Sequence, residues 1–233
     1  TNLALEAVTG IDLDNVNAVP TFSGNDVDNL SIRVTGAAAA NDATFKDVDD
    51  VNFAVVDGVA SPNAVNVVSD LTLIAGGAVT QSAAIVTGGL ELIDLFNDPN
   101  PPLTFLAFPN YYLPHSSNSI GRLEAYSQRN VNITNSIPLA VTTVANAYRT
   151  FPASGASGVW VQSLLLTAPT VTVNSPIETN DELGYVTFDV TTLLDLNNNI
   201  FSRGKIEQIG TGVVTVADIE LRTTDDNITF LGG

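Results

Sequence analysis

The stretch "AVNVVSDLTLIAG" (residues 64–76) decides the fold class of this chain. Valine, isoleucine, leucine and threonine dominate it, and β-branched and apolar residues in a short run that ends at glycine favour a β-strand. Comparable segments recur along the chain, at residues 30–36, 51–58, 131–134, 139–148, 158–167, 170–174, 184–194 and 212–223. The sequence therefore predicts nine or more strands and an all-β protein.

Turn-forming clusters such as "NDPNPP", "PASGASG" and "LNNN" separate these segments. No segment has a sustained helical period, and the best short helical candidate is "GRLEAYSQRN" (residues 121–130). Strands at this spacing, without alternating helices, favour an antiparallel arrangement. We expect one antiparallel β-sandwich of the jelly-roll type over residues 1–233. An additional small β-barrel domain, inserted or appended within residues 99–177, is an alternative, and an immunoglobulin-like sandwich is the second choice.

Composition excludes several kinds of site. The chain of 233 residues has no cysteine and one histidine, so disulfides, thiolate catalysis and transition-metal clusters are not expected. A formal net charge of -17 repels nucleic acid and anionic membranes, and it suits a halophilic protein that stays soluble in concentrated salt. Acids interrupt the apolar runs before they reach the ~18 residues of a membrane helix, so no direct membrane insertion is expected. Thr1 in place of methionine predicts a processed N-terminus.

Charge is distributed unevenly along the chain. Residues 1–57, 58–98 and 178–233 have net charges of -8, -4 and -7, whereas residues 99–177 have a net charge of +2. The neutral middle includes the aromatic loop "PPLTFLAFPNYYLPHSSN" (residues 101–118). A strand-rich segment with few charges is either core or contact surface with other subunits. Its aromatic, proline-punctuated loop favours contact surface.

Three acidic stretches raise the question of calcium: "DLDNVN" from Asp12, "DVDNLS" from Asp26 and "DVDDVN" from Asp47. An EF-type loop needs an oxygen ligand at its fifth position and a carboxylate at its twelfth. The fifth positions are Val16, Leu30 and Val51, and the twelfth are Ser23, Ala37 and Gly58. On a strand, by contrast, Asp12 and Asp14 share one face, as do Asp47 and Asp49. The spacing therefore predicts solvated strand edges, and no metal-binding residue is assigned.

No catalytic residue is assigned either. A serine triad requires a base, and the single histidine, His115, stands beside Ser116 and Ser117 in a loop, where sequence neighbours rarely form a nucleophile and base pair. The stretch "SGASGVW" has Val159 where a nucleophile elbow requires glycine. Trp160, within "GVWVQSLLL", is expected in the core. We therefore expect no enzyme and no cofactor.

Self-assembly accounts best for these features. The strand series over residues 30–223, the scarcity of lysine (Lys46 and Lys205) and the small Thr1 give the chain an overall character that resembles the single jelly-roll major capsid proteins of tailless icosahedral viruses of halophilic archaea. The resemblance implies a subunit that packs side by side with copies of itself, and with a sister structural protein, into a virion capsid. It carries no functional residue onto this chain.

Two further classes of function stay open. One is an exported extracellular filament or surface-layer subunit, in which "TNLALEAVTG" (residues 1–10) would donate a strand to the next subunit. The other is an adhesive or carbohydrate-binding β module, which Trp160, Tyr111 and Tyr112 support. In the exported case, Asn29, Asn132 and Asn227 stand in glycosylation sequons.

Overall fold

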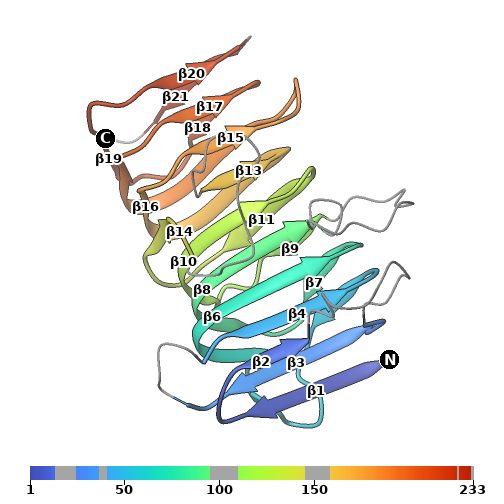
Figure 1. The fold of residues 1–233 in the computed structure, drawn as a ribbon. Helices are drawn as coiled ribbons and strands as arrows, with labels where there is room; N and C mark the ends of the chain where they lie inside the picture. The colour runs from blue at the N-terminus through green and yellow to red at the C-terminus, as the bar shows by residue number, and fades with distance from the viewer. Residues whose placement is uncertain (14–24, 37–40, 95–109, 145–157, 225, 232–233) are drawn as a thin grey trace.

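A computed structural model describes residues 1–13, 25–36, 41–94, 110–144, 158–224 and 226–231. These residues contain strands and no helix, so the all-β prediction is confirmed. The strands belong to one hydrogen-bonded sheet of 21 strands, and every pairing between them is parallel. Figure 1 shows them stacked along one axis, with the N-terminus at one end and the C-terminal strands at the other. The chain is a parallel β-helix, in which successive coils lie on top of one another.

The strands of each coil contribute to three stacked ladders. Ladder 1 contains the first residues of β1 (Asn2–Ala7) and β3 (Asn29–Val34), then β5 (Val51–Phe53), β7 (Val79–Gln81), β9 (Tyr111–Leu113), β11 (Asn130–Thr134), the first parts of β14 (Ser163–Val173) and β16 (Val186–Leu196), β18 (Ile206–Gln208) and β21 (Ile228–Phe230).

Ladder 2 contains the last residues of β1 and β3, the first parts of β6 (Val65–Ala75), β8 (Ile85–Asp94) and β10 (Ser119–Tyr126), then β12 (Leu139–Val141), the last parts of β14 and β16, and β19 (Val213–Val216). Ladder 3 contains β2 (Ile11–Leu13), β4 (Ala43–Asp47), the last parts of β6, β8 and β10, then β13 (Val159–Val161), β15 (Ile177–Thr179), β17 (Ile200–Ser202) and β20 (Leu221–Thr223).

The expected antiparallel jelly roll is therefore wrong for the described strands. A chain that reverses direction at each turn makes antiparallel neighbours, but here each corner sends the chain onto the next side of a coil. Two parallel strands of one ladder are then joined by the remaining sides of the coil, which provide the long crossover that parallel pairing requires. The described strands within residues 99–177 pair with strands before and after them in the same sheet. The segment 121–130, the best short helical candidate in the sequence, lies largely in β10.

Coil length is most regular toward the C-terminus. Leu164, Val186, Ile206 and Ile228 are consecutive partners in ladder 1 and lie 22, 20 and 22 residues apart. The step from Val131 to Leu164 is 33 residues and includes 145–157, which lies outside the described residues. The step from Val79 to Tyr111 is 32 residues and includes 95–109, also outside them. Of the aromatic loop 101–118, residues 101–109 therefore lie outside the described residues, while Tyr111 and Tyr112 lie in β9.

The core is a set of apolar columns inside the coil. Inward residues stack on inward residues of the next coil, because parallel strands in register keep the same alternation of faces. One unbroken column of ladder 3 consists of Leu13, Phe45, Leu73, Leu92, Ala125, Val159, Ile177, Ile200 and Leu221. All but the two terminal leucines are buried, and those two are half-buried against the same core. The period of two in the sequence therefore sets which residues are inside.

Candidate functional site

The stretch 46–58 places its acids in different environments. Asp47 ends β4 with its side chain fully buried, while Asp49 and Asp50 in the following turn are exposed. The prediction that Asp47 is a solvated edge residue is wrong, because it continues the inward alternation of Ala43 and Phe45. Its carboxylate accepts hydrogen bonds from the backbone N–H groups of Val27 and Asp49, each at 3.2 Å. Burial and the nearby Asp49 carboxyl raise the pKa of Asp47 to about 8.

The described acids of the three stretches do not converge on a cation site. Asp12 is exposed on β2, with Ile11 and Leu13 turned to the core, as the strand interpretation predicted, and Asp14 lies outside the described residues. Asp28 binds the amino group of Thr1, and Asp50 accepts a hydrogen bond from the Ala78 N–H at 2.6 Å. Within the described ranges, no group of three or more histidine, cysteine, aspartate or glutamate side chains is placed to hold a metal ion.

His115 is half-buried in the corner after β9, and its Nδ1 accepts a hydrogen bond from the backbone N–H of Ser117. Its backbone N–H donates to Gln81 and its carbonyl accepts from the Asn118 N–H. Ser116 and Ser117 are both exposed. These contacts give His115 a role in shaping the corner.

Trp160 does not lie in the core. Its neighbours Val159 and Val161 point inward and are buried, so the alternation turns the indole outward. It stacks on Tyr126 of the preceding coil, with ring centroids 4.7 Å apart and an interplanar angle of 20°. Of the tyrosine pair, Tyr111 is buried and donates a hydrogen bond to the Ile93 carbonyl, while Tyr112 is 53% exposed.

A row of polar side chains where ladder 2 meets ladder 3 was not predicted. Asp70, Gly89 and Arg122 are register partners on three successive coils, and Arg122 Nη2 donates to Asp70 Oδ1 at 2.6 Å. Glycine between them is required, because a Cβ on Gly89 would lie 2.5 Å from Asp70 Oδ1. The ion pair therefore ties together two coils across a third. Its sequence signal is a charged residue at the centre of an apolar strand, as in "SDLTLIA".

A second polar column runs beside this row. Thr72 donates to Glu91 at 2.8 Å on the next coil, and the backbone N–H of Val144 donates to Glu124 at 2.9 Å on the coil after it. All three side chains are at most 5% exposed. Their hydrogen bonds hold successive coils in register, since buried carboxylates are costly without donors.

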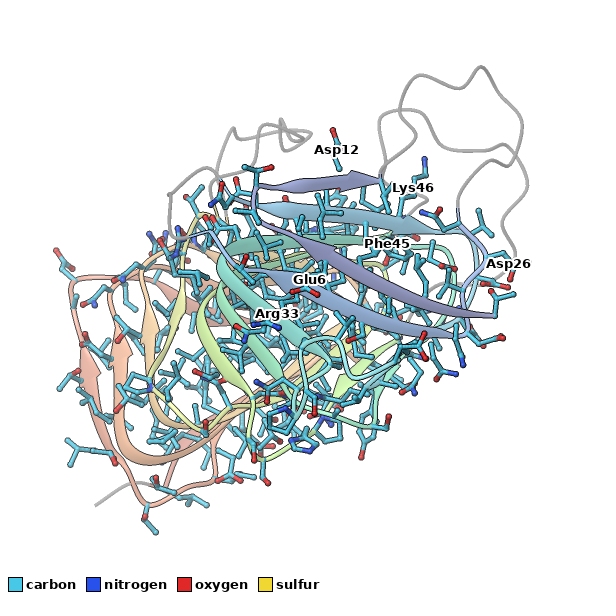
Figure 2. All side chains as sticks on the ribbon, turned by 90° about the horizontal axis from the view of Figure 1, so that it is seen from below. Glu6, Asp12, Asp26, Arg33, Phe45 and Lys46 are labelled. Carbon is cyan, nitrogen blue, oxygen red and sulfur yellow. The ribbon has the colours of Figure 1, made fainter. Side chains whose placement is uncertain are left out.

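The two end coils are the most exposed parts of the sheet. Among the described residues, β1 and β2 each pair on one edge only, and so do β19, β20 and β21. Figure 2 views the molecule from the end that β1 and β2 form, with Asp12 pointing outward and Phe45 pointing inward. At the opposite end Val213, Val216 and Ile228 are 52%, 51% and 41% exposed. Unpaired edges beside exposed apolar side chains are sites where another strand can add.

A ladder of side-chain amides reaches the first of these ends. Asn2, Asn29 and Asn52 are register partners on the outer side of ladder 1. Asn52 donates to Asn29, and Asn29 donates to Asn2, both at 2.9 Å. The Asn2 side-chain N–H₂ group makes no hydrogen bond within the described part of the chain. The series of amide hydrogen bonds therefore ends at Asn2 with a donor that has no acceptor there.

Comparison with protein-family models, with curated proteins and with solved structures finds no match for this chain. No helix in the residues that the structure describes is long and apolar enough to span a membrane. The fold, the end coils and the outer face of ladder 3 are therefore the observations from which function is argued.

Proposed function

We propose that this chain is a self-assembling structural subunit whose copies stack end to end, with the last coil of one copy pairing with the first coil of the next. The observation that carries the proposal is the pair of strand edges that have no partner strand within the described residues, β1 with β2 at one end and β19 to β21 at the other. Addition of a strand to an open edge supplies backbone hydrogen bonds, while stacked side chains supply specificity.

The register of the ladders matches the two ends. Leu13 and Leu221 are the two ends of one apolar column of ladder 3, so stacking in the same register places them in contact. In ladder 1, Leu3, Leu30 and Phe53 are register partners that point inward on the first coils. Phe230 occupies the corresponding inward position of β21 on the last coil. Each junction would then repeat an apolar contact that already exists between coils, and it would cover side chains that are now half-buried.

The amide ladder favours the same register. Asn2 occupies the outward position of ladder 1 that Thr229 occupies in β21. Its free amide N–H₂ would then face the Thr229 hydroxyl, which can accept a hydrogen bond. A single register therefore satisfies both the core columns and this outward pair.

The assembly expected from this contact is an open filament. A head-to-tail contact uses two different surfaces, so it does not close into a dimer, and each addition exposes the same edge again. Within each ladder all strands run in the same direction, so a junction that continues the parallel pairing gives every subunit of the filament the same orientation. Copies of the chain itself are thus the principal partner that we propose.

Charge opposes assembly at low salt. Asp12 of the first coil and Glu220 of the last occupy equivalent outward positions in ladder 3, and the chain has a net charge of -17. Screening shortens the range of this repulsion to roughly 3 Å at 1 M salt. Filaments are therefore expected in concentrated salt, in agreement with a halophilic setting, and separate subunits at low salt.

The location that we propose is a virion or, alternatively, an extracellular surface. The resemblance to jelly-roll capsid proteins depended on an antiparallel sandwich, and the parallel pairings do not provide one. We therefore retain assembly, a sister structural protein as a further partner, and the virion or extracellular location, without the jelly roll. The donated-strand version of the filament is replaced, because β1 pairs with β3 of its own chain.

Electron microscopy and sedimentation velocity of the purified chain between 0.1 and ~3 M salt test the proposal. We expect straight filaments of one coil's width above a critical concentration that falls as salt rises. Ile228→Lys places a charge at the open edge, next to the position that Thr1 of the next copy takes in the filament. It should raise the critical concentration at least ~10-fold, equivalent to about 1.4 kcal/mol.

Tyr112→Lys is the matched control, because it adds the same charge at a similarly exposed position on the side of the coil. It should leave filaments intact. Monomers at every salt concentration would contradict the proposal, and so would loss of assembly in Tyr112→Lys with filaments preserved in Ile228→Lys, since that pattern requires side-by-side contact.

A further inference from the structure

A groove of about 290 Å³ lies on the outer side of ladder 3, near the C-terminal end of the coil. Its lining comes from β15, β17, β20 and the turns that follow β17 and β20. The residues are Glu178, Thr179, Phe201, Ser202, Arg203, Arg222 and Thr224. Pockets for small molecules begin at about this size, so the groove suits a ligand of one sugar ring's dimensions.

The register of the coils builds the floor of the groove. Glu178, Phe201 and Arg222 are partners at the centres of β15, β17 and β20. Their neighbours Ile177 and Ile200 are buried in the core, so the alternation turns these three side chains outward, about 4.8 Å apart from one coil to the next. Trp160 precedes Glu178 in the same column. An aromatic ring therefore lies on each side of Glu178.

The charge of the groove is opposite to that of the molecule. Arg203 and Arg222 form no ion pair within the described part of the chain, whereas Arg33, Arg122 and Lys205 pair with Glu6, Asp70 and Glu207. The chain has 25 acidic residues against 8 basic ones, so acidic partners are abundant. Two guanidinium groups without an ion-pair partner among the described residues share one groove, and Glu178 is the only carboxylate among its described lining residues. Together they make a local site for an anion.

We propose that this groove binds a sugar that bears a carboxylate, such as a hexuronate. Each guanidinium can hold a carboxylate through two parallel hydrogen bonds, and arginine is the side chain best suited to this geometry. The half-buried Phe201 presents an apolar ring against which the C–H face of a sugar can pack. Glu178 accepts hydrogen bonds from sugar hydroxyl groups. This arrangement uses all three side chains of the register column.

The inference goes beyond end-to-end assembly and does not depend on it, because the groove is complete within one chain. Its lining includes Arg222 of the end strand β20, so binding is measured on the monomer. A phosphate or sulfate ion could use the arginines, but it would gain nothing from Phe201. Comparing an acidic sugar with a neutral sugar and with a simple anion therefore separates the contribution of the two arginines from that of Phe201.

The single tryptophan of the chain supplies the measurement, because Trp160 stands next to Glu178 in the column. We would titrate the monomer at low salt with D-glucuronate, D-glucose, acetate and sulfate, and follow Trp160 fluorescence together with isothermal titration calorimetry. Saturable binding of glucuronate, at least tenfold tighter than binding of each of the other three, is expected. Sulfate or acetate binding as tightly as glucuronate would overturn the sugar assignment, and so would the absence of saturation.

Three variants locate the site. Arg203→Gln and Arg222→Gln should each weaken glucuronate at least tenfold, and Phe201→Ser should weaken glucuronate while leaving the weak acetate signal unchanged. Arg33→Gln is the control, since it removes one exposed positive charge near the other end of the coil. Thermal unfolding of every variant checks that the fold is kept. An equal loss in Arg33→Gln would assign binding to overall charge and overturn the proposal.

Discussion

At the scale of single residues, Asp47 couples the stability of the coil to pH. Its pKa is about 8 in the folded chain against 3.8 as the ordinary value, with burial as the main cause. Between these values the unfolded chain has released a proton that the folded chain still holds. The free energy of unfolding should therefore decrease as pH rises from about 4 to about 8, by at most ~1.4 kcal/mol per pH unit from this group.

Asp47→Asn removes the titration and should flatten this decrease. Urea unfolding at several pH values between 4 and 8 measures it, at a protein concentration and salt that keep the chain monomeric. Asp57→Asn, at an exposed position in the loop after β5, is the control and should keep the slope of the unmodified chain. If Asp47→Asn keeps that slope as well, Asp47 is not the group responsible.

At the scale of elements, buried asparagines organise the corners between ladders 1 and 2. Asn118 is fully buried, and its amide oxygen accepts from the Ile85 N–H at 2.8 Å while its N–H₂ donates to the carbonyls of Leu113 and Thr134. Asn135 makes the equivalent contacts one coil later, with both backbone groups of Ile120. Each asparagine satisfies backbone groups of adjacent coils that the strands leave unpaired.

Asn118→Ala would leave several of these backbone groups buried without partners. We expect it to lower the free energy of unfolding by about 2–4 kcal/mol, since each such group costs about 1–3 kcal/mol and the structure can relax in part. Asn132→Ala is a matched control on the outer side of β11 and should change the free energy of unfolding by less than ~0.5 kcal/mol. Guanidinium unfolding compares them. Equal effects would mean that the corner contacts contribute nothing beyond an exposed amide.

At the scale of the whole molecule, stability is expected to depend on position along the coil. Each coil contacts only its neighbours, so an inner coil is supported on both sides and an end coil on one. Leu92 and Leu221 test this, because they belong to the same apolar column but only Leu92 has coils above and below it. Leu92→Ala should cost about 2–5 kcal/mol, and Leu221→Ala about 1 kcal/mol in the monomer.

Assembly should reverse part of that difference. In the proposed filament Leu221 is covered by Leu13 of the next copy, so Leu221→Ala should weaken assembly in concentrated salt more than Leu92→Ala does. Thermal unfolding of monomers at low salt and of filaments at high salt gives the two measurements. Equal costs at both positions in the monomer would contradict an additive, coil-by-coil account of stability.

Strand positions could be predicted well because they depend on local pattern. The segments 30–36, 64–76 and 131–134 correspond closely to β3, β6 and β11. The outward position of Trp160 could not be predicted from the sequence, because an aromatic residue between two valines is compatible both with a core position and with an outward stack. Likewise Asp47 and Asp49 are two residues apart, so the strand pattern alone places them on the same face. Only the bend of the chain after β4 buries Asp47 and exposes Asp49.

The sequence by itself determined that this chain is all-β, which residues alternate between two faces, and that its surface is acidic. These properties depend on residues one or two positions apart, where side-chain direction and polarity act directly. Only the tertiary structure decided that the strands pair in parallel and stack as coils. Glycine, proline and asparagine mark a hairpin and a coil corner alike, and the partner of each strand, some 20 residues away or more, is selected by core packing. For the same reason, the open end coils and the groove at Phe201 became visible only when distant strands were in register.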